Sequence, residues 1–171
     1  MASLTAGRLD PWRWIAAPMV LCMAATLVLA APIKLFGLQL PEPVFAMVPA
    51  FAWAVLRPSV LAPLCLLALG LFDDLVWGGR LGLWGLGLLA AYGLVLVTRN
   101  MMSGQSRVMM WVWYGAAWTV CMGAALLAVL AETHNAPNLL ALAGQWLPTL
   151  LLYPAADRLI VRFEDADPRF R

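Results

Sequence analysis

Asp73 and Asp74 are the side chains of this sequence whose type and spacing come closest to a reactive site. Adjacent carboxylates in an apolar segment could bind a divalent cation or transfer a proton. Enzymes that hold Mg²⁺ against a polyprenyl diphosphate use two such acids and a third one three residues further on. Trp77 stands at that third position, and the chain has no second acidic cluster. The pair therefore predicts no catalytic site.

Other groups able to bind a metal or form a nucleophile are isolated in the sequence. The three cysteines, Cys22, Cys65 and Cys121, are far apart and lack a C-x-x-C spacing, and His134 is the only histidine. Such cysteines are typical of small buried apolar residues. The remaining polar residues of the apolar segments, Thr119, Gln145 and Thr149, are expected to form hydrogen bonds between helices. The sequence predicts no enzyme, no metal site and no cofactor.

The composition indicates that lipid surrounds most of this chain. Of its 171 residues 64% are hydrophobic and only 12% are charged, whereas about a quarter are charged in a typical soluble domain. The net charge of +2 gives no reason to expect binding to nucleic acid. We therefore expect an integral membrane protein made of α-helices.

The apolar segments predict one bundle of about six transmembrane helices at 14–161, between a cytoplasmic N-terminal segment at 1–13 and a cytoplasmic tail at 162–171. The six expected helices are Trp14–Phe36, Val44–Leu56, Ser59–Trp77, Leu81–Thr98, Val108–Ala131 and Leu139–Ile160. The first is expected to be an uncleaved helix, because it is longer than a signal-peptide core and further spans follow. Loops are expected at 100–107 and 132–138, and the tail is expected to be solvated and poorly ordered.

Prolines and glycines predict where these helices bend or end. The second helix contains Pro49 and covers only about 20 Å, so it is either continued by its flanks or a partial, kinked span. Pro148 and Pro154 are expected to bend the sixth helix. Two glycines after an apolar run are a helix stop, so the third helix is expected to end at Gly78 and Gly79.

The distribution of basic residues predicts the orientation of the bundle. With six spans and a cytoplasmic N-terminus, one side holds nine arginines and the other holds only Lys34 and Arg80. The nine are Arg8, Arg13, Arg57, Arg99, Arg107, Arg158, Arg162, Arg169 and Arg171. Because cytoplasmic loops carry the excess of basic residues, both termini are expected in the cytoplasm of a multi-pass inner-membrane protein.

The position of the aspartate pair leaves three roles open. Asp73 lies about 24 Å along the helix from Arg57, near the outer end. In one role a carboxylate reaches outer water while the other caps a helix or pairs with Arg80. In the second a carboxylate faces the bundle and fixes helix packing or a partner site. Proton transfer or ion binding is the third.

Glycines on the fourth helix predict a packing face. Gly82, Gly85 and Gly93 fall within about 80° of one another on a helical wheel. A stripe of glycines permits the close approach of another helix, from this chain or from a partner. If a partner lies there, leucine at Gly82 and Gly85 is expected to weaken its binding.

These features together resemble the rod shape-determining protein MreD family. The resemblance lies in prolines Pro41 and Pro43 before the second helix, Arg57-Pro58 before the third, and Leu69-Gly70-Leu71 with Asp73 or Asp74, followed by Gly78 or Gly79 and Leu81-Gly82. The ending D-P-R-F-R is similar to that of alphaproteobacterial members. The resemblance covers most of the chain, although family members usually carry one aspartate here.

The resemblance implies a fold similar to the S subunits of energy-coupling-factor transporters and a non-enzymatic role. It implies a scaffold of the elongation complex that binds MreC and, through it, MreB, RodA and a class B penicillin-binding transpeptidase, in contact with membrane lipid. The alternative is an S-type transporter subunit that binds a small ligand. The residues expected to form a packing or partner site are Arg57, Pro58, Gly70, Asp73, Asp74, Gly78, Arg80, Gly82, Gly85 and Gly93.

Overall fold

The computed structural model describes residues 12–30, 43–56, 59–133 and 139–164, and these residues form helices and short turns without a strand. The elements are η1 (Trp12–Ala16, one π-helical turn), α1 (Ala17–Ala30), α2 (Met47–Leu56), α3 (Leu61–Val76), α4 (Leu83–Met102), α5 (Arg107–Thr133), α6 (Leu139–Leu150) and α7 (Tyr153–Glu164). The prediction of an all-α chain is thereby confirmed for the described residues.

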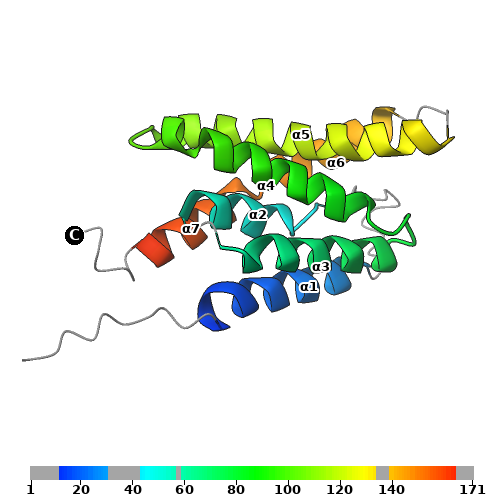
Figure 1. Cartoon of the computed structure of the whole chain (residues 1–171), viewed down its shortest axis with the longest axis horizontal. Helices are drawn as coiled ribbons and strands as arrows, with labels where there is room; N and C mark the ends of the chain where they lie inside the picture. The colour runs from blue at the N-terminus through cyan, green and yellow to red at the C-terminus, as the bar shows by residue number, and fades with distance from the viewer. Residues whose placement is uncertain (1–11, 31–42, 57–58, 134–138, 165–171) are drawn as a thin grey trace, which may run out of the picture.

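The helices run back and forth between two ends of one bundle (Figure 1). One end holds the start of η1, the last turn of α2, the α4–α5 turn and the last turn of α7. We name it the arginine end, after the exposed side chains of Arg99, Arg107, Arg158 and Arg162. The opposite end holds the α3–α4 turn, and we name it the aspartate end after Asp73 and Asp74. The first described residue of η1 and the last described turn of α7 both lie at the arginine end (Figure 1).

Two helices, α4 and α5, are long and apolar enough to cross a membrane. The apolar stretches cover 20 residues at 83–102 and 25 residues at 107–131. Both helices also expose large apolar side chains, among them Leu86, Val97, Val112 and Leu127. Exposed apolar side chains on long apolar helices favour contact with lipid, so the structure supports a membrane protein.

The second predicted helix forms the centre of the bundle instead of a complete span. Seven of the ten residues of α2 are buried, and Phe51 and Trp53 are completely covered. Phe51 contacts Tyr114 of α5 edge to face with ring centroids 5.3 Å apart, and the Trp53 indole donates a hydrogen bond to the carbonyl of Trp14 at 3.2 Å. Ten residues cover only about 15 Å, about half of a bilayer core. Its predicted start at Val44 was wrong, because 43–46 form a turn that leads into α2.

The sixth predicted helix is divided into two helices, α6 and α7, because a turn at Leu151 and Leu152 interrupts it. Pro154 has no backbone N–H, so the carbonyl of Leu150 lacks its helical donor, and a proline is tolerated in the first turn of a new helix. The indole of Trp111 donates to the Leu150 carbonyl at 3.1 Å. The hydroxyl of Tyr114 donates to the Thr149 carbonyl at 3.2 Å. The expected bend is therefore a complete interruption of the helix, at which α5 donates to the Leu150 carbonyl, while the Thr149 carbonyl also accepts from the backbone N–H of Leu152 at 3.1 Å.

Several other predicted boundaries differ from the structure. The loop predicted at 100–107 covers only 103–106, because the backbone N–H of Met109 bonds to the Ser106 side chain and Gly104 adopts a left-handed φ of 75°. Both α5 and α7 extend past their predicted ends, to Thr133 and Glu164, so the tail predicted from 162 begins later. The predicted residues 31–36, His134 and 165–171 lie outside the described residues.

Candidate functional site

The α3–α4 turn at the aspartate end is built by two glycines that adopt left-handed backbone conformations. Gly78 has a φ of 62°, and the N–H of Gly79 donates to the carbonyl of Asp74 at 2.9 Å. This bond closes the end of α3 in the manner of a Schellman motif. The predicted stop at Gly78 and Gly79 is confirmed, since α3 ends at Val76. Gly82, with a φ of 94°, then begins α4.

Asp74 caps the helix that follows the turn. Its carboxylate accepts hydrogen bonds from the backbone N–H of Gly82 at 2.7 Å and from that of Trp84 at 3.2 Å. The side chain is completely buried. Free N–H groups at a helix start carry partial positive charge and need acceptors, so the carboxylate is satisfied by the backbone of α4. A side chain from the end of α3 thus replaces the N-cap side chain that Gly82 lacks.

Asp73 connects α3 to α1. The hydroxyl of Thr26 donates a hydrogen bond to its carboxylate at 3.3 Å. Both side chains are nearly inaccessible, at 3% exposure for Asp73 and 4% for Thr26. This contact joins residues 47 positions apart. Asp73 therefore contributes one buried polar contact between α1 and α3.

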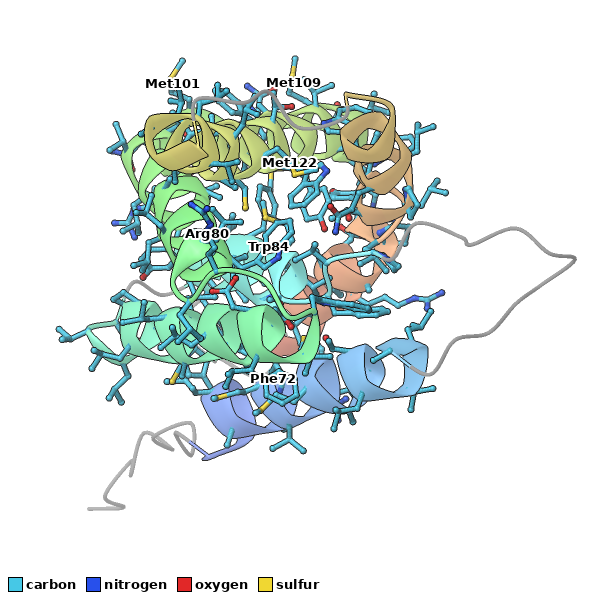
Figure 2. All side chains as sticks on the ribbon, turned by 90° about the vertical axis from the view of Figure 1, so that its right-hand side faces the viewer. Phe72, Arg80, Trp84, Met101, Met109 and Met122 are labelled. Carbon is cyan, nitrogen blue, oxygen red and sulfur yellow. The ribbon has the colours of Figure 1, made fainter. Side chains whose placement is uncertain are left out.

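The two carboxylates thus have different neighbours, and the structure decides part of the choice left open by the sequence. The expectation that one aspartate reaches outer water is wrong, since both are buried. The expected capping is confirmed for Asp74, and a bundle-facing role in helix packing holds for Asp73. Arg80 lies exposed in the turn between the two helices (Figure 2). Within the described part of the chain no group of three His, Cys, Asp or Glu side chains could hold a metal ion.

The glycines of the expected stripe have separate roles and do not form one face. A Cβ on Gly70 of α3 would overlap the backbone of Gly85 and Trp84, so α3 and α4 cross here in backbone contact. Gly85 is buried against Leu67 of α3, which makes it an internal packing residue. Gly82 adopts the left-handed conformation that the α3–α4 turn requires. No atom lies within 4 Å of a Cβ built on Gly93. Of the two alternatives left open for the stripe, internal packing holds for Gly85.

A glycine that sequence reasoning missed holds α4 against α5. A Cβ on Gly87 would lie 2.9 Å from the carbonyl oxygen of Cys121 and 3.0 Å from its sulfur. Gly87 lies two residues after Gly85, and an i, i+2 spacing puts it on another side of the helix. Two glycines on different faces of α4 thus receive α3 and α5.

A polar junction joins α6 to the turn that precedes α2. Thr149 is completely buried, accepts a hydrogen bond from the backbone N–H of Val44 at 3.0 Å, and donates one to the carbonyl of Gln145. The sequence predicted such bonds for its isolated polar residues, and Thr119, which accepts from the Trp146 indole at 3.2 Å, confirms the same expectation. The partner Val44 could not be predicted, because it contributes only a backbone group 105 positions away.

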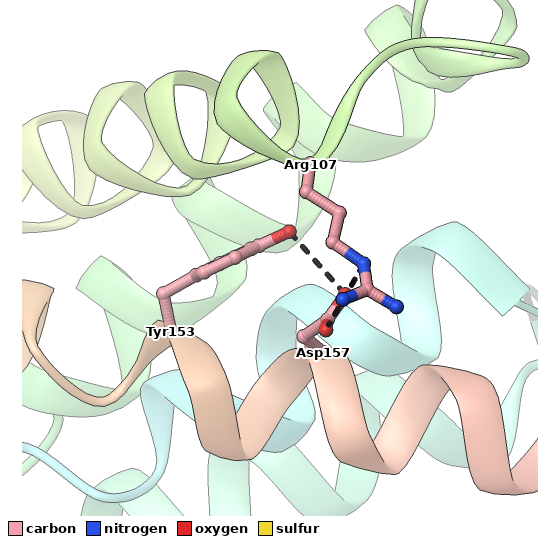
Figure 3. A network of polar contacts seen from close by, with 3 residues as sticks. All are labelled: Arg107, Tyr153 and Asp157. Carbon is pink, nitrogen blue, oxygen red and sulfur yellow. Dashed lines mark hydrogen bonds and ion pairs between the residues drawn. The ribbon is translucent and has the colours of Figure 1, made fainter.

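At the arginine end a small ionic network connects α5 with α7 (Figure 3). The Tyr153 hydroxyl donates to the Asp157 carboxylate at 3.5 Å, and the other carboxylate oxygen lies 4.0 Å from Nε of Arg107. Arg107 is 83% exposed and Asp157 is 26% exposed. The remaining predicted site residues, Arg57 and Pro58, lie outside the described residues.

Comparisons with known proteins return no match: no protein-family model, no curated protein and no solved structure is similar to this chain.

Proposed function

We propose that this chain is a non-enzymatic membrane scaffold similar to MreD, which supports cell-shape maintenance and lateral peptidoglycan synthesis. The observation that carries the proposal is the use of the aspartate pair. Both carboxylates are buried, and their hydrogen bonds join α1, α3 and α4. The side chains that come closest to a reactive site thus serve the architecture of the bundle. This arrangement suits a protein that presents a fixed surface to partners.

One face of α4 offers a place for a partner helix. Leu86, Ala90, Gly93, Val97 and Met101 fall within about 80° of one another on a helical wheel. Leu86, Val97 and Met101 are 53%, 82% and 64% exposed, and no atom lies within 4 Å of a Cβ on Gly93. Met101 points away from the bundle (Figure 2). Two small residues between large apolar ones permit the close approach of another transmembrane helix.

In this proposal the transmembrane helix of MreC lies along the α4 face, here defined by Leu86, Ala90, Gly93, Val97 and Met101. MreC then connects the scaffold to MreB, RodA and a class B penicillin-binding transpeptidase. Van der Waals contact between closely packed backbones supplies most of the attraction between helices in lipid. The exposed arginines at the end of α4 and the start of α5 face the partners outside the bilayer.

The test is co-purification of a tagged copy of the chain with MreC from the same organism, from membranes dissolved in mild detergent. The wild type is expected to retain MreC in a fixed ratio. Gly93→Leu should lower the retained MreC several-fold, because the larger side chain would keep the partner helix from approaching closely. Gly123→Leu on α5 is the matched control, since a Cβ there also meets no atom within 4 Å, and it should retain MreC like the wild type.

Two outcomes would contradict the proposal at different levels. If all three proteins retain MreC equally, the α4 face is not the contact. If the folded wild type retains no MreC, the scaffold assignment fails. Titration of the purified chain with small ligands would then test the alternative, an S-type transporter subunit.

A further inference from the structure

The outward side of α7 carries two arginines one helical turn apart. Tyr153, Ala156 and Ile160 are buried on one side of α7, which packs on α2. Arg158, Val161 and Arg162 are exposed on the opposite side. At 100° per residue the three exposed positions fall within about 100° of one another. We name Arg107, Arg158, Val161 and Arg162 the α7 basic face, for the reason given next.

Arg107 joins this group from another helix. Asp157 precedes Arg158 in the chain, and its carboxylate lies 4.0 Å from Nε of Arg107 at the first residue of α5. Tyr153 donates to the same carboxylate from the preceding turn of α7 (Figure 3). The network therefore places the guanidinium of Arg107 beside the stretch of α7 that carries Arg158 and Arg162. The residues after Phe163 carry three acids and two arginines, so the excess of positive charge resides in the α7 basic face.

The apolar surface beside Arg107 indicates how deep this face lies in the membrane. The first turns of α5 expose Val108 at 70%, Val112 at 60% and Trp111 at 41%. Met109 points away from the bundle (Figure 2). Trp at the boundary of an apolar helix and Arg directly beyond it are typical of the depth of lipid headgroups. The α7 basic face therefore lies next to the headgroups of the membrane that α5 crosses.

We propose that Arg107, Arg158 and Arg162 bind the phosphate of an anionic phospholipid of the surrounding membrane. Guanidinium groups match phosphate oxygens in charge and in planar, two-pronged geometry. Val161 is exposed on the same side of α7 as Arg158 and Arg162 and offers an apolar surface for the first acyl carbons of the lipid. Asp157 orients Arg107 toward this site, because the carboxylate holds only the Nε edge of the guanidinium. This inference goes beyond the proposed scaffold function and does not depend on it.

The test measures retention of lipid by the purified full-length chain in detergent, by native mass spectrometry with added phosphatidylglycerol or phosphatidylcholine. The wild type is expected to prefer phosphatidylglycerol. The double variant Arg158→Gln/Arg162→Gln should lose affinity for it by about twenty-five-fold, from about fivefold for each arginine near an anionic surface. Arg80→Gln, an exposed arginine at the aspartate end, is the matched control and should bind like the wild type. Circular dichroism checks that each variant keeps its helix content.

Two results would overturn the proposal. One is equal retention of phosphatidylglycerol by the double variant, the control and the wild type. The other is displacement of the bound lipid by glycerol phosphate at similar concentration, which would identify a site for free phosphate esters. Lysine at positions 158 and 162 should restore most of the affinity, since it keeps the charge and loses only the geometry. Failure of MreC to co-purify would leave these lipid measurements unchanged, so the two proposals are tested separately.

Discussion

Two neighbouring aspartates have different roles because a helix separates consecutive side chains by about 100°. Asp74 points to the start of α4, where two backbone N–H groups bind it, and Asp73 points to Thr26 of α1. Each carboxylate is thereby buried with hydrogen-bond donors, which offsets the cost of removing it from water. Two consecutive aspartates at the end of α3 therefore connect this helix to both α1 and α4.

Replacing Asp74 by alanine should lower the free energy of unfolding by about 2 kcal/mol, because it removes the cap of α4 and leaves buried N–H groups without acceptors. Asp74→Asn keeps one oxygen acceptor and should lose less. Reversible denaturation of the purified protein in detergent micelles measures both effects. Equal stability of the wild type and Asp74→Ala would show that the cap contributes nothing.

For single residues, the sequence identified the side chains that have special structural roles. It identified few of the groups that these side chains contact. The pair, the turn glycines and the isolated threonines were all identified as special residues from their types and positions. Their partners were not, since Thr26 and Val44 come from distant segments and nothing in their own neighbourhoods marks them. Capping of α4 by a side chain of the preceding helix is a consequence of the turn geometry, which the sequence does not specify.

Helix α4 packs against α2, α3 and α5. Glycines on two of its sides allow α3 and α5 to approach it closely. Gly85 meets Gly70 of α3, and Gly87 meets Cys121 of α5. Helix association in lipid depends on such close packing, since there is little hydrophobic driving force between apolar helices. In this arrangement α4 lies between α3 and α5 and packs closely against both.

Gly70→Ala should destabilise the protein by about 2–3 kcal/mol, because its methyl group would overlap the Gly85 backbone and force α3 and α4 apart. Gly93→Ala is the opposite case, with no atom near its new Cβ, and should be neutral or stabilise by up to about 1 kcal/mol through helix propensity. Thermal unfolding of the two variants in the same detergent compares them. Similar melting temperatures for both would contradict the close crossing.

Helix positions were predictable from runs of apolar residues, and helix continuity was not. The six expected segments all contain helix in their described parts, since each apolar run is bounded by glycine, proline or charge. At the interruption between α6 and α7, Trp111 and Tyr114 of α5 donate to the carbonyls of Leu150 and Thr149. A proline alone is compatible with a bend or a break, so the outcome is decided by tertiary contacts.

The molecule as a whole has one strongly basic end and one end with the buried acids. Exposed arginines of α4, α5 and α7 gather at the former, and the α3–α4 turn forms the latter (Figure 1). Such asymmetry is the basis of the positive-inside rule. For the described arginines the predicted grouping agrees with the structure, since Arg99, Arg107, Arg158 and Arg162 lie at one end and Arg80 at the other.

The two ends should lie on opposite sides of the membrane. In a variant without Cys22, Cys65 and Cys121, a single cysteine at Leu81 is expected to react with a membrane-impermeant maleimide in intact cells. A cysteine at Gln105 in the α4–α5 turn should react only after the cells are permeabilised. Labelling of both positions in intact cells would contradict a crossing by α4.

The buried α2 also has a consequence for how the chain enters the membrane during synthesis. A ten-residue helix is too short to be retained in a bilayer by its own hydrophobicity. Its backbone is self-satisfied, yet its apolar surface is covered by α4, α7 and the neighbouring helices that are made after it. We therefore expect α2 to stay associated with the insertion machinery until the later helices have been synthesised and inserted. The centre of the bundle would then form last, although it is among the first parts to be translated.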